Sequence, residues 1–157
     1  MRPIIPSLWF DGNAEEAVKF YLNIFKGSKI LRVSHYTKAG PLPEGTVLAI
    51  SFKLGKTEFL AINGGPEFKP TPAVSFVIEC KDQKEIDHYW KKLTAGGKEV
   101  QCGWLTDKYG YSWQVVAAAQ MKRIASKDKA AVDRVMRAMG AMVKLDEKKL
   151  KAAFEGR

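Results

Sequence analysis

Cys102 is the side chain of this 157-residue chain whose type offers the most direct chemistry. A cysteine thiolate is a strong nucleophile, but the thiol needs a neighbouring base or cation that lowers its pKa. Cys102 stands between Gln101 and Gly103, and no histidine is near it in the sequence. We keep it as the one catalytic candidate, beside the alternative that it packs in the core as free cysteines often do.

His35 and His88 are the only histidines. Neither has a second ligand-type side chain at a metal-binding spacing. His88 lies off the apolar stripe of its predicted helix and is expected at the surface. His35 lies on the apolar side of a predicted strand, which favours a buried, hydrogen-bonded ring over the alternative of a catalytic base. Asp107, which precedes Lys108-Tyr109-Gly110, is interpreted as a turn residue.

An internal repeat predicts the elements that position these side chains. A shift of 69 positions aligns Asn13 with Asp82 and Glu16 with Glu85, so that both predicted helices begin with a sequence resembling a capping box. Apolar residues then recur at helical spacing over residues 17–24 and 86–93. Alternating patterns predict strands at 30–36, 46–54 and 57–63, and again at 98–101, 104–107 and 112–117.

Each half therefore has the predicted order βαβββ, at about residues 1–66 and 72–119, with a linker rich in Gly and Pro between them. Neither half is large enough to close a core alone. We expect an α+β fold in which the tandem βαβββ repeats of residues 1–119 form a cupped mixed sheet with the helices outside.

Residues 120–157 are predicted to be a helical extension of the same domain. Ser126 and Asp128 are plausible helix caps, and an apolar stripe follows at helical spacing, made of Val132, Val135, Met136, Met139, Met142 and Val143. We expect this stripe to pack on its own domain or on a dimer partner, with a peptide-binding groove as the alternative.

Charge is concentrated in that extension. Its 11 basic and 5 acidic side chains account for most of the net charge of +9. Acidic residues are interleaved with the basic ones, and Phe154 is the only aromatic residue of the extension. This pattern favours a solvated helix face over a nucleic-acid interface, which usually gathers its cations on one face with stacking aromatics.

Composition and the chain's start exclude several classes of protein. The 46% hydrophobic content is enough for a packed core. No apolar run is long enough to cross a bilayer, so no membrane partner is expected. The start lacks the pattern of a secretion signal, and two cysteines, Cys80 and Cys102, cannot make a disulfide framework. We therefore expect a cytoplasmic protein.

Three strings of residues resemble a known family. They are LWFDGNAEEA (8–17) with Phe20-Tyr21, NGGP (63–66), and QCGWLTDKYGYSWQ (101–114). With the tandem βαβββ pattern, they resemble the vicinal oxygen chelate superfamily, which includes glyoxalase I, bleomycin-resistance proteins and extradiol dioxygenases. Within it the resemblance is closest to the PhnB-like branch, often labelled 3-demethylubiquinone-9 3-methyltransferase-like. It covers about residues 3–117, and the Met-rich helix extends it to nearly the whole chain.

The resemblance implies four metal-ligand positions, which fall on Pro6, Ala61, Ser75 and Gln114. These residue types are poor ligands for a divalent ion, which binds tightly to His, Asp, Glu or Cys. We therefore predict no metal in the usual place and no other cofactor. The sequence also lacks the Gly-rich turn between a strand and a helix that commonly holds a methyl donor.

If Gln114 occupies an old ligand position, its side of the last strand faces the cup. Asn63, Ser75 and Gln114 could then make hydrogen bonds in a pocket walled by Leu8, Phe68 and Trp104, with Cys102 nearby. The alternative is that the protein's own side chains fill the cup.

Two functions follow from this resemblance. The first is a metal-free protein that binds a small molecule in the cup and forms a homodimer. The second is an enzyme of the same superfamily, a lyase, dioxygenase or transferase, that acts through Cys102 or through a divalent metal recruited by its substrate.

Overall fold

The first half of the chain folds as a strand, a helix and three further strands. The computed structural model describes residues 4–157, and the chain divides into two units, Met1–Lys69 and Pro70–Arg157. The first unit contains β1 (Ser7–Phe10), α1 (Ala14–Ile24), β2 (Lys29–His35), β3 (Val47–Leu54) and β4 (Thr57–Asn63). Its sheet has the order β1-β4-β3-β2, with β1 parallel to β4 and the other neighbours antiparallel.

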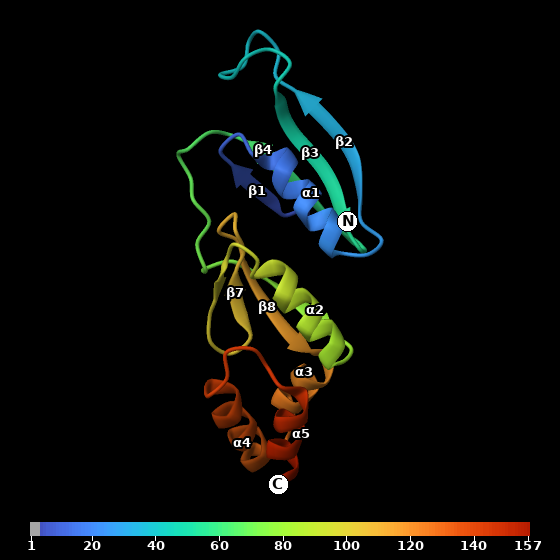
Figure 1. The fold of residues 1–157 in the computed structure, drawn as a ribbon, viewed down its shortest axis with the longest axis vertical. Helices are drawn as coiled ribbons and strands as arrows, with labels where there is room; N and C mark the ends of the chain where they lie inside the picture. The colour runs from blue at the N-terminus through green and yellow to red at the C-terminus, as the bar shows by residue number, and fades with distance from the viewer. Residues whose placement is uncertain (1–3) are drawn as a thin grey trace. The chain divides into compact units, whose positions relative to one another are not determined.

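Helix α1 lies on one side of this sheet (Figure 1). The buried side chains of the helix recur at helical spacing and are Ala14, Ala17, Val18, Tyr21 and Ile24. They face the buried side of the sheet, which alternates along each strand and includes Leu8, Phe10, Ile50, Phe52 and Ala61. Each large apolar side chain buried in this layer contributes roughly 1.5–3 kcal/mol to the stability of the fold.

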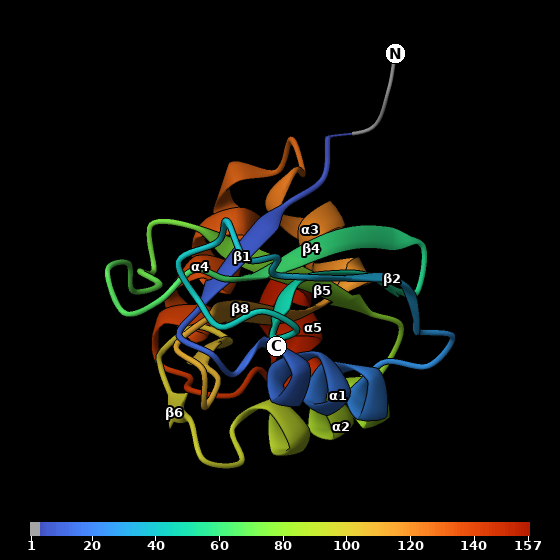
Figure 2. The same cartoon turned by 90° about the horizontal axis from the view of Figure 1, so that it is seen from above.

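The second unit repeats this arrangement with shorter strands. Its elements are β5 (Ser75–Cys80), α2 (Gln83–Leu93), β6 (Lys98–Glu99), β7 (Trp104–Thr106) and β8 (Ser112–Ala117). The sheet order β5-β8-β7-β6 matches that of the first sheet, and β5 is again parallel to β8. Figure 2 shows each helix on one side of its own sheet. Two four-stranded mixed sheets, each covered by a helix, confirm the predicted α+β class.

Helix α2 begins with the predicted cap. The Asp82 carboxylate accepts the backbone N–H of Glu85 at 3.0 Å. The Glu85 carboxylate accepts the N–H of Lys81 at 2.9 Å, one residue before the position expected in a capping box. Hydrogen bonds to Lys81 lower the pKa of Glu85, with the backbone N–H as the largest cause. The helix then buries Ile86, Trp90 and Leu93 against its sheet.

Three helices follow the second sheet, and they belong to the second unit. They are α3 (Ala118–Ile124), α4 (Lys129–Gly140) and α5 (Glu147–Glu155). Their apolar core is the cluster of Val116, Val135, Leu145 and Leu150, with Met139, Met142 and Phe154 packed against it. The extension therefore packs on its own chain, through the β8 residue Val116. Among residues 4–157, no helix is both long and apolar enough to span a membrane.

The predicted apolar stripe of the extension is only partly correct. Met136 is 47% exposed, and Val143 is also exposed. Met142 and Val143 lie beyond the end of α4, in the segment that leads to α5. The helix ends at Gly140, so the helical spacing assumed for these two residues does not apply to them. Asp128 caps α4 as predicted, because its carboxylate accepts the N–H of Ala131 at 3.0 Å.

Candidate functional site

The second sheet has one face covered by α2 and one face free of that helix. The register pairs Val77 with Gln114 and Gln114 with Trp104, so these three residues form one row across β5, β8 and β7. Ser75, Ser112 and Thr106 form the neighbouring row on the same face. The buried Trp113 and Val115 point to the opposite face, because side chains alternate along a strand. We call the face with these two rows the open face of the second sheet.

The open face brings together three of the predicted site residues, Ser75, Trp104 and Gln114. The Gln114 side-chain amide donates a hydrogen bond to the Ser75 hydroxyl at 2.9 Å. All three residues are half-buried, and Val77 beside them is 49% exposed. The face thus offers an oriented amide, a hydroxyl and an indole ring among apolar atoms. Such a surface can hydrogen-bond one end of a small molecule and stack against its flat part.

The extension covers one end of this face. Val116, which follows Gln114 on the same side of β8, is buried in the cluster formed with α4 and α5. Gln114 and Ser75 remain half-buried outside that cluster. The part of the open face that the extension does not cover therefore consists of the two rows that contain Ser75, Trp104 and Gln114.

In the first sheet, Leu8, Ala61 and Asn63 lie on the face that α1 covers. All three are buried, and the register pairs Leu8 with Ala61. The parallel pairs end at Phe10 with Asn63 in the first sheet and at Cys80 with Ala117 in the second. Leu60 lies three residues before the last pair of the first sheet, and Gln114 lies three residues before the last pair of the second. Leu60 is therefore the structural counterpart of Gln114. The resemblance to the superfamily had placed this ligand position at Ala61, which lies on the other face.

The Asn63 side chain forms hydrogen bonds that fix the start of α1. Its oxygen accepts the N–H of Ala14 at 2.9 Å, and its nitrogen donates to the carbonyl of Val47 at 3.0 Å. Asn13 makes no side-chain hydrogen bond to the helix end, so the prediction that it caps α1 is wrong. Asn63 satisfies that end from 49 residues further along the chain. Its role as a ligand-binding residue stays a prediction.

Phe68 is 62% exposed and lies after the first sheet. Its ring meets Trp9 edge to face, with centroids 5.0 Å apart. The Trp9 indole donates to the carbonyl of Gly65 at 2.8 Å, which fixes the indole beside the linker. Trp9 therefore anchors this segment, and no pattern in the sequence singled it out.

Cys102 lies in the tight turn between β6 and β7. Its φ is 60°, that of Gly103 is 81°, and the Trp104 N–H donates to the Gln101 carbonyl at 3.1 Å. Positive φ at both central residues is the requirement of a type I′ turn. The N–H groups of Cys102 and Gly103 donate to the carbonyls of Met142 and Val143, each at 2.8 Å, and tie the extension to this turn.

The two thiols differ in surroundings. Cys102 is half-buried, and within residues 4–157 no side chain forms a hydrogen bond with its thiol. Cys80 is fully buried, as predicted, and burial raises the pKa of its thiol to about 12. Cys80 is therefore protonated and unreactive at neutral pH.

The two histidines lie at the surface. His88 is exposed on α2 as predicted, but His35 is also exposed, so the prediction of a buried ring is wrong. Every residue of β2, an edge strand of its sheet, is exposed. Asp107 is a turn residue as predicted, and its carboxylate also accepts the indole N–H of Trp113 at 2.8 Å.

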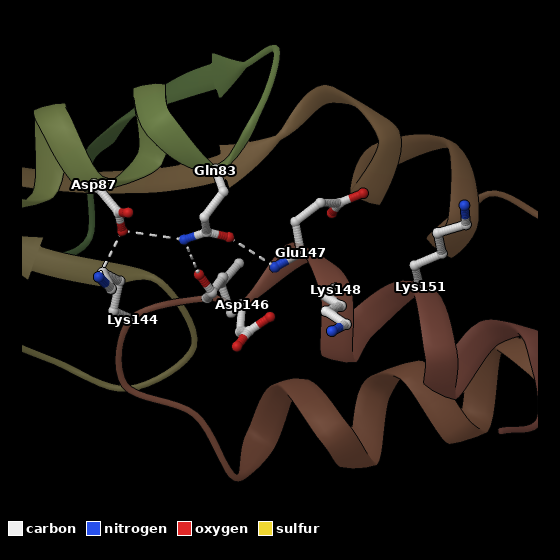
Figure 3. A pocket seen from close by; sticks show the side chains of 8 residues that line it. Gln83, Asp87, Lys144, Asp146, Glu147, Lys148 and Lys151 are labelled. Carbon is white, nitrogen blue, oxygen red and sulfur yellow. Dashed lines mark hydrogen bonds and ion pairs between the residues drawn. The ribbon is translucent and has the colours of Figure 1, made fainter.

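A pocket of about 520 Å³ lies between α2 and the start of α5 (Figure 3). Its Gln83 side chain donates to the carbonyl of Leu145 and accepts the N–H of Glu147 at 2.9 Å. Asp87 pairs with Lys144 at 2.5 Å, and this hydrogen bond lowers the pKa of Asp87. Glu147 pairs with Arg123 through two hydrogen bonds. Gln83 and Asp87 therefore attach the extension to α2, and the pair of Arg123 and Glu147 joins α3 to α5.

Comparison with known proteins identifies the family. The model of the family described as 3-demethylubiquinone-9 3-methyltransferase matches residues 2–116. The chain belongs to this family. The match ends at Val116, so the helices α3, α4 and α5 lie beyond it.

Solved structures share the fold of this family member. The PhnB protein from Bacillus cereus is 38% identical, with a TM-score of 0.68 over 74% of this chain and 100% of that one. A protein from Pseudomonas aeruginosa is 20% identical, with a TM-score of 0.62 over 74% of this chain and 98% of that one. The fosfomycin resistance protein FosX from Listeria monocytogenes, solved with Mn(II) and sulfate, is 15% identical. Its TM-score is 0.53, over 79% of this chain and 95% of that one. A comparison with curated proteins finds no match.

The residues of this PhnB-like chain do not fit the metal that the superfamily fold implies. Pro6 and Ala61 have no ligating side-chain atom, and neither has Leu60, the structural counterpart of Gln114. The Ser75 hydroxyl and the Gln114 amide are neutral and already bonded to one another. Within residues 4–157, no three His, Cys, Asp or Glu side chains are grouped so that they could hold a metal ion. A donor set of two neutral oxygens is too weak for a tight divalent site.

Proposed function

We propose that this member of the family binds a small organic molecule on the open face of the second sheet, without a resident metal ion. The hydrogen bond between Gln114 and Ser75, in the row beside Trp104, is the observation that supports the proposal. It fixes the orientation of the amide, so that the remaining hydrogen-bonding atoms have a defined direction. A ligand with a flat apolar part and one or two polar groups fits this surface.

The proposal includes the wider set of residues expected from the sequence. Leu8, Asn63, Phe68 and Cys102 stay proposed ligand-binding residues, although the first two are buried beneath α1. A homodimer in the cytoplasm also stays a prediction. The enzyme alternative, through Cys102 or a metal recruited by the substrate, has less support because no base among residues 4–157 is hydrogen-bonded to the thiol.

Native mass spectrometry of freshly purified protein tests the metal and the assembly together. We expect the mass of a dimer with no stoichiometric divalent ion, and with a small molecule bound where one co-purifies. One Mn, Fe, Ni or Zn ion for each chain would contradict the metal-free proposal.

A thermal-shift panel of small aromatic acids, amides and phenols tests the site. We expect at least one compound to raise the Tm of the wild type, and this increase to disappear in Gln114→Leu and Trp104→Leu. The matched control is Gln101→Leu, the same change at an exposed turn position, which should keep the response. A response that survives both site variants would reject the open face as the site. A ligand response and turnover that both disappear in Cys102→Ser would instead support the thiol alternative.

A further inference from the structure

A second pocket, of about 370 Å³, lies entirely within the first unit. It is bounded by the start of α1, the end of β2, the end of β4 and the loop that precedes β3. The nine residues that line it are Gly12, Glu15, His35, Leu42, Pro43, Gly45, Thr46, Val47 and Asn63. None of them belongs to the open face of the second sheet, and Asn63 is the one lining residue that is also among the ligand-binding residues proposed above.

The walls of the pocket are held in place by hydrogen bonds. Asn63, only 3% exposed, joins α1 to β3 through Ala14 and Val47. The Tyr36 hydroxyl donates to the carbonyl of Asn63 at 2.7 Å, which ties the beginning of the loop to the same point. Backbone hydrogen bonds between Tyr36 and residues 45 and 46 close the loop. The pocket is therefore formed before any ligand arrives, which reduces the entropic cost of binding.

Two titratable side chains in this pocket have no partner in the described part of the chain. Neither Glu15 nor His35 forms a side-chain hydrogen bond or ion pair with any residue of 4–157. Glu15 lies in the first turn of α1. Both side chains therefore keep their full hydrogen-bonding capacity for a ligand.

The lining determines what kind of ligand fits. Glu15 is the only carboxylate among the nine lining residues, and none of the nine is Lys or Arg, so the pocket favours a positive charge. A neutral imidazole at His35 can accept one N–H. Leu42, Pro43 and Val47 supply apolar surface for a short carbon skeleton. We propose that this pocket binds a small organic ammonium ion, with Glu15 as its counter-ion and His35 as a second hydrogen-bonding partner.

A titration of the full ¹⁵N-labelled chain with n-butylammonium chloride tests this inference by NMR. We expect saturable shifts, with a millimolar Kd, at the backbone amides of Gly12, Gly45, Thr46 and Val47. 1-Butanol, of the same size but uncharged, should bind at least about fivefold more weakly, and sodium butyrate should cause no saturable shift. Equal binding of butanol, tighter binding of butyrate or Mg²⁺, or shifts that do not saturate would overturn the proposal.

Two variants that each remove one negative charge distinguish binding at Glu15 from attraction by the overall surface charge. Glu15→Gln should weaken n-butylammonium binding about fivefold, the factor expected for loss of one exposed ion pair. Glu44→Gln, an exposed residue of the loop that does not line the pocket, should leave the Kd unchanged. Equal effects of the two variants would show that the carboxylate of Glu15 does not act as the counter-ion. Both side chains are exposed, so both variants should give the dispersed spectrum of a folded protein.

Discussion

At the scale of single residues, Asn63 has a structural task that the sequence did not predict, beside the ligand-binding role that stays a prediction. Its position among apolar strand residues indicated a polar group facing a pocket. The structure shows both amide atoms bonded within the protein, one to the end of α1 and one to β3. A partner 49 residues away in sequence cannot be inferred from a local capping pattern such as the one at Asn13.

We predict that Asn63→Ala destabilises the protein by about 1–3 kcal/mol, because it leaves the N–H of Ala14 and the carbonyl of Val47 without partners in a buried site. Asn13→Ala should cost less than about 0.5 kcal/mol, since the Asn13 side chain does not cap the helix. Urea unfolding followed by circular dichroism measures both values. A larger loss for Asn13→Ala than for Asn63→Ala would show that the local cap dominates.

At the scale of elements, the sequence predicted the helices and most strands but not the strand register. The shift of 69 positions is correct for the helices, which begin at Ala14 and Gln83. The connection before the first helix, residues 11–13, is one residue longer than its counterpart, residues 81 and 82. The last residues of β1 and β5, Phe10 and Cys80, are therefore 70 positions apart. Since side chains alternate along a strand, an error of one residue exchanges the two faces.

The end of α4 also differs from the prediction made from the apolar spacing of the extension. The apolar spacing predicted a helix, and α4 is present, but the residues after Gly140 follow a different path. The carbonyls of Met142 and Val143 accept N–H groups from the turn at Cys102 and Gly103. A turn made of Cys and Gly has no recognisable sequence signature, because Asn-Gly and Asp-Gly are the usual type I′ pairs.

This turn gives a prediction at the element scale. Cys102→Asn should raise the free energy of unfolding by about 0.5–1 kcal/mol, because Asn adopts a positive φ at lower cost than most residues. Cys102→Val should lower it by about 1–2 kcal/mol, since a β-branched side chain is strained there. Both variants remove the thiol, so their opposite effects separate backbone strain from loss of sulfur contacts. Destabilisation by Asn as well as by Val would show that packing of the thiol matters more than φ.

At the scale of the whole molecule, membership of the family shows the fold more firmly than the function. The family match and the Bacillus cereus structure cover the duplicated part, and one fold supports many chemistries. The function is therefore inferred from residues of this chain. They are the neutral side chains of Ser75 and Gln114 on the open face of the second sheet, and the carboxylate of Glu15 in the pocket of the first unit. The open face lies within the second unit and the pocket within the first, so these two surfaces can be tested separately.

The division into units predicts that residues 70–157 fold alone. This fragment contains the whole second sheet, α2 and the cluster around Val135 and Leu145, so it has an apolar core of its own. We expect a cooperative urea transition with an m-value roughly half that of the full chain, because m scales with the surface exposed on unfolding. Leu145→Ala in the same fragment, which removes a fully buried side chain, should cost about 2–5 kcal/mol and abolish or strongly shift the transition. A fragment that unfolds without cooperativity would show instead that the first unit completes the core of the second.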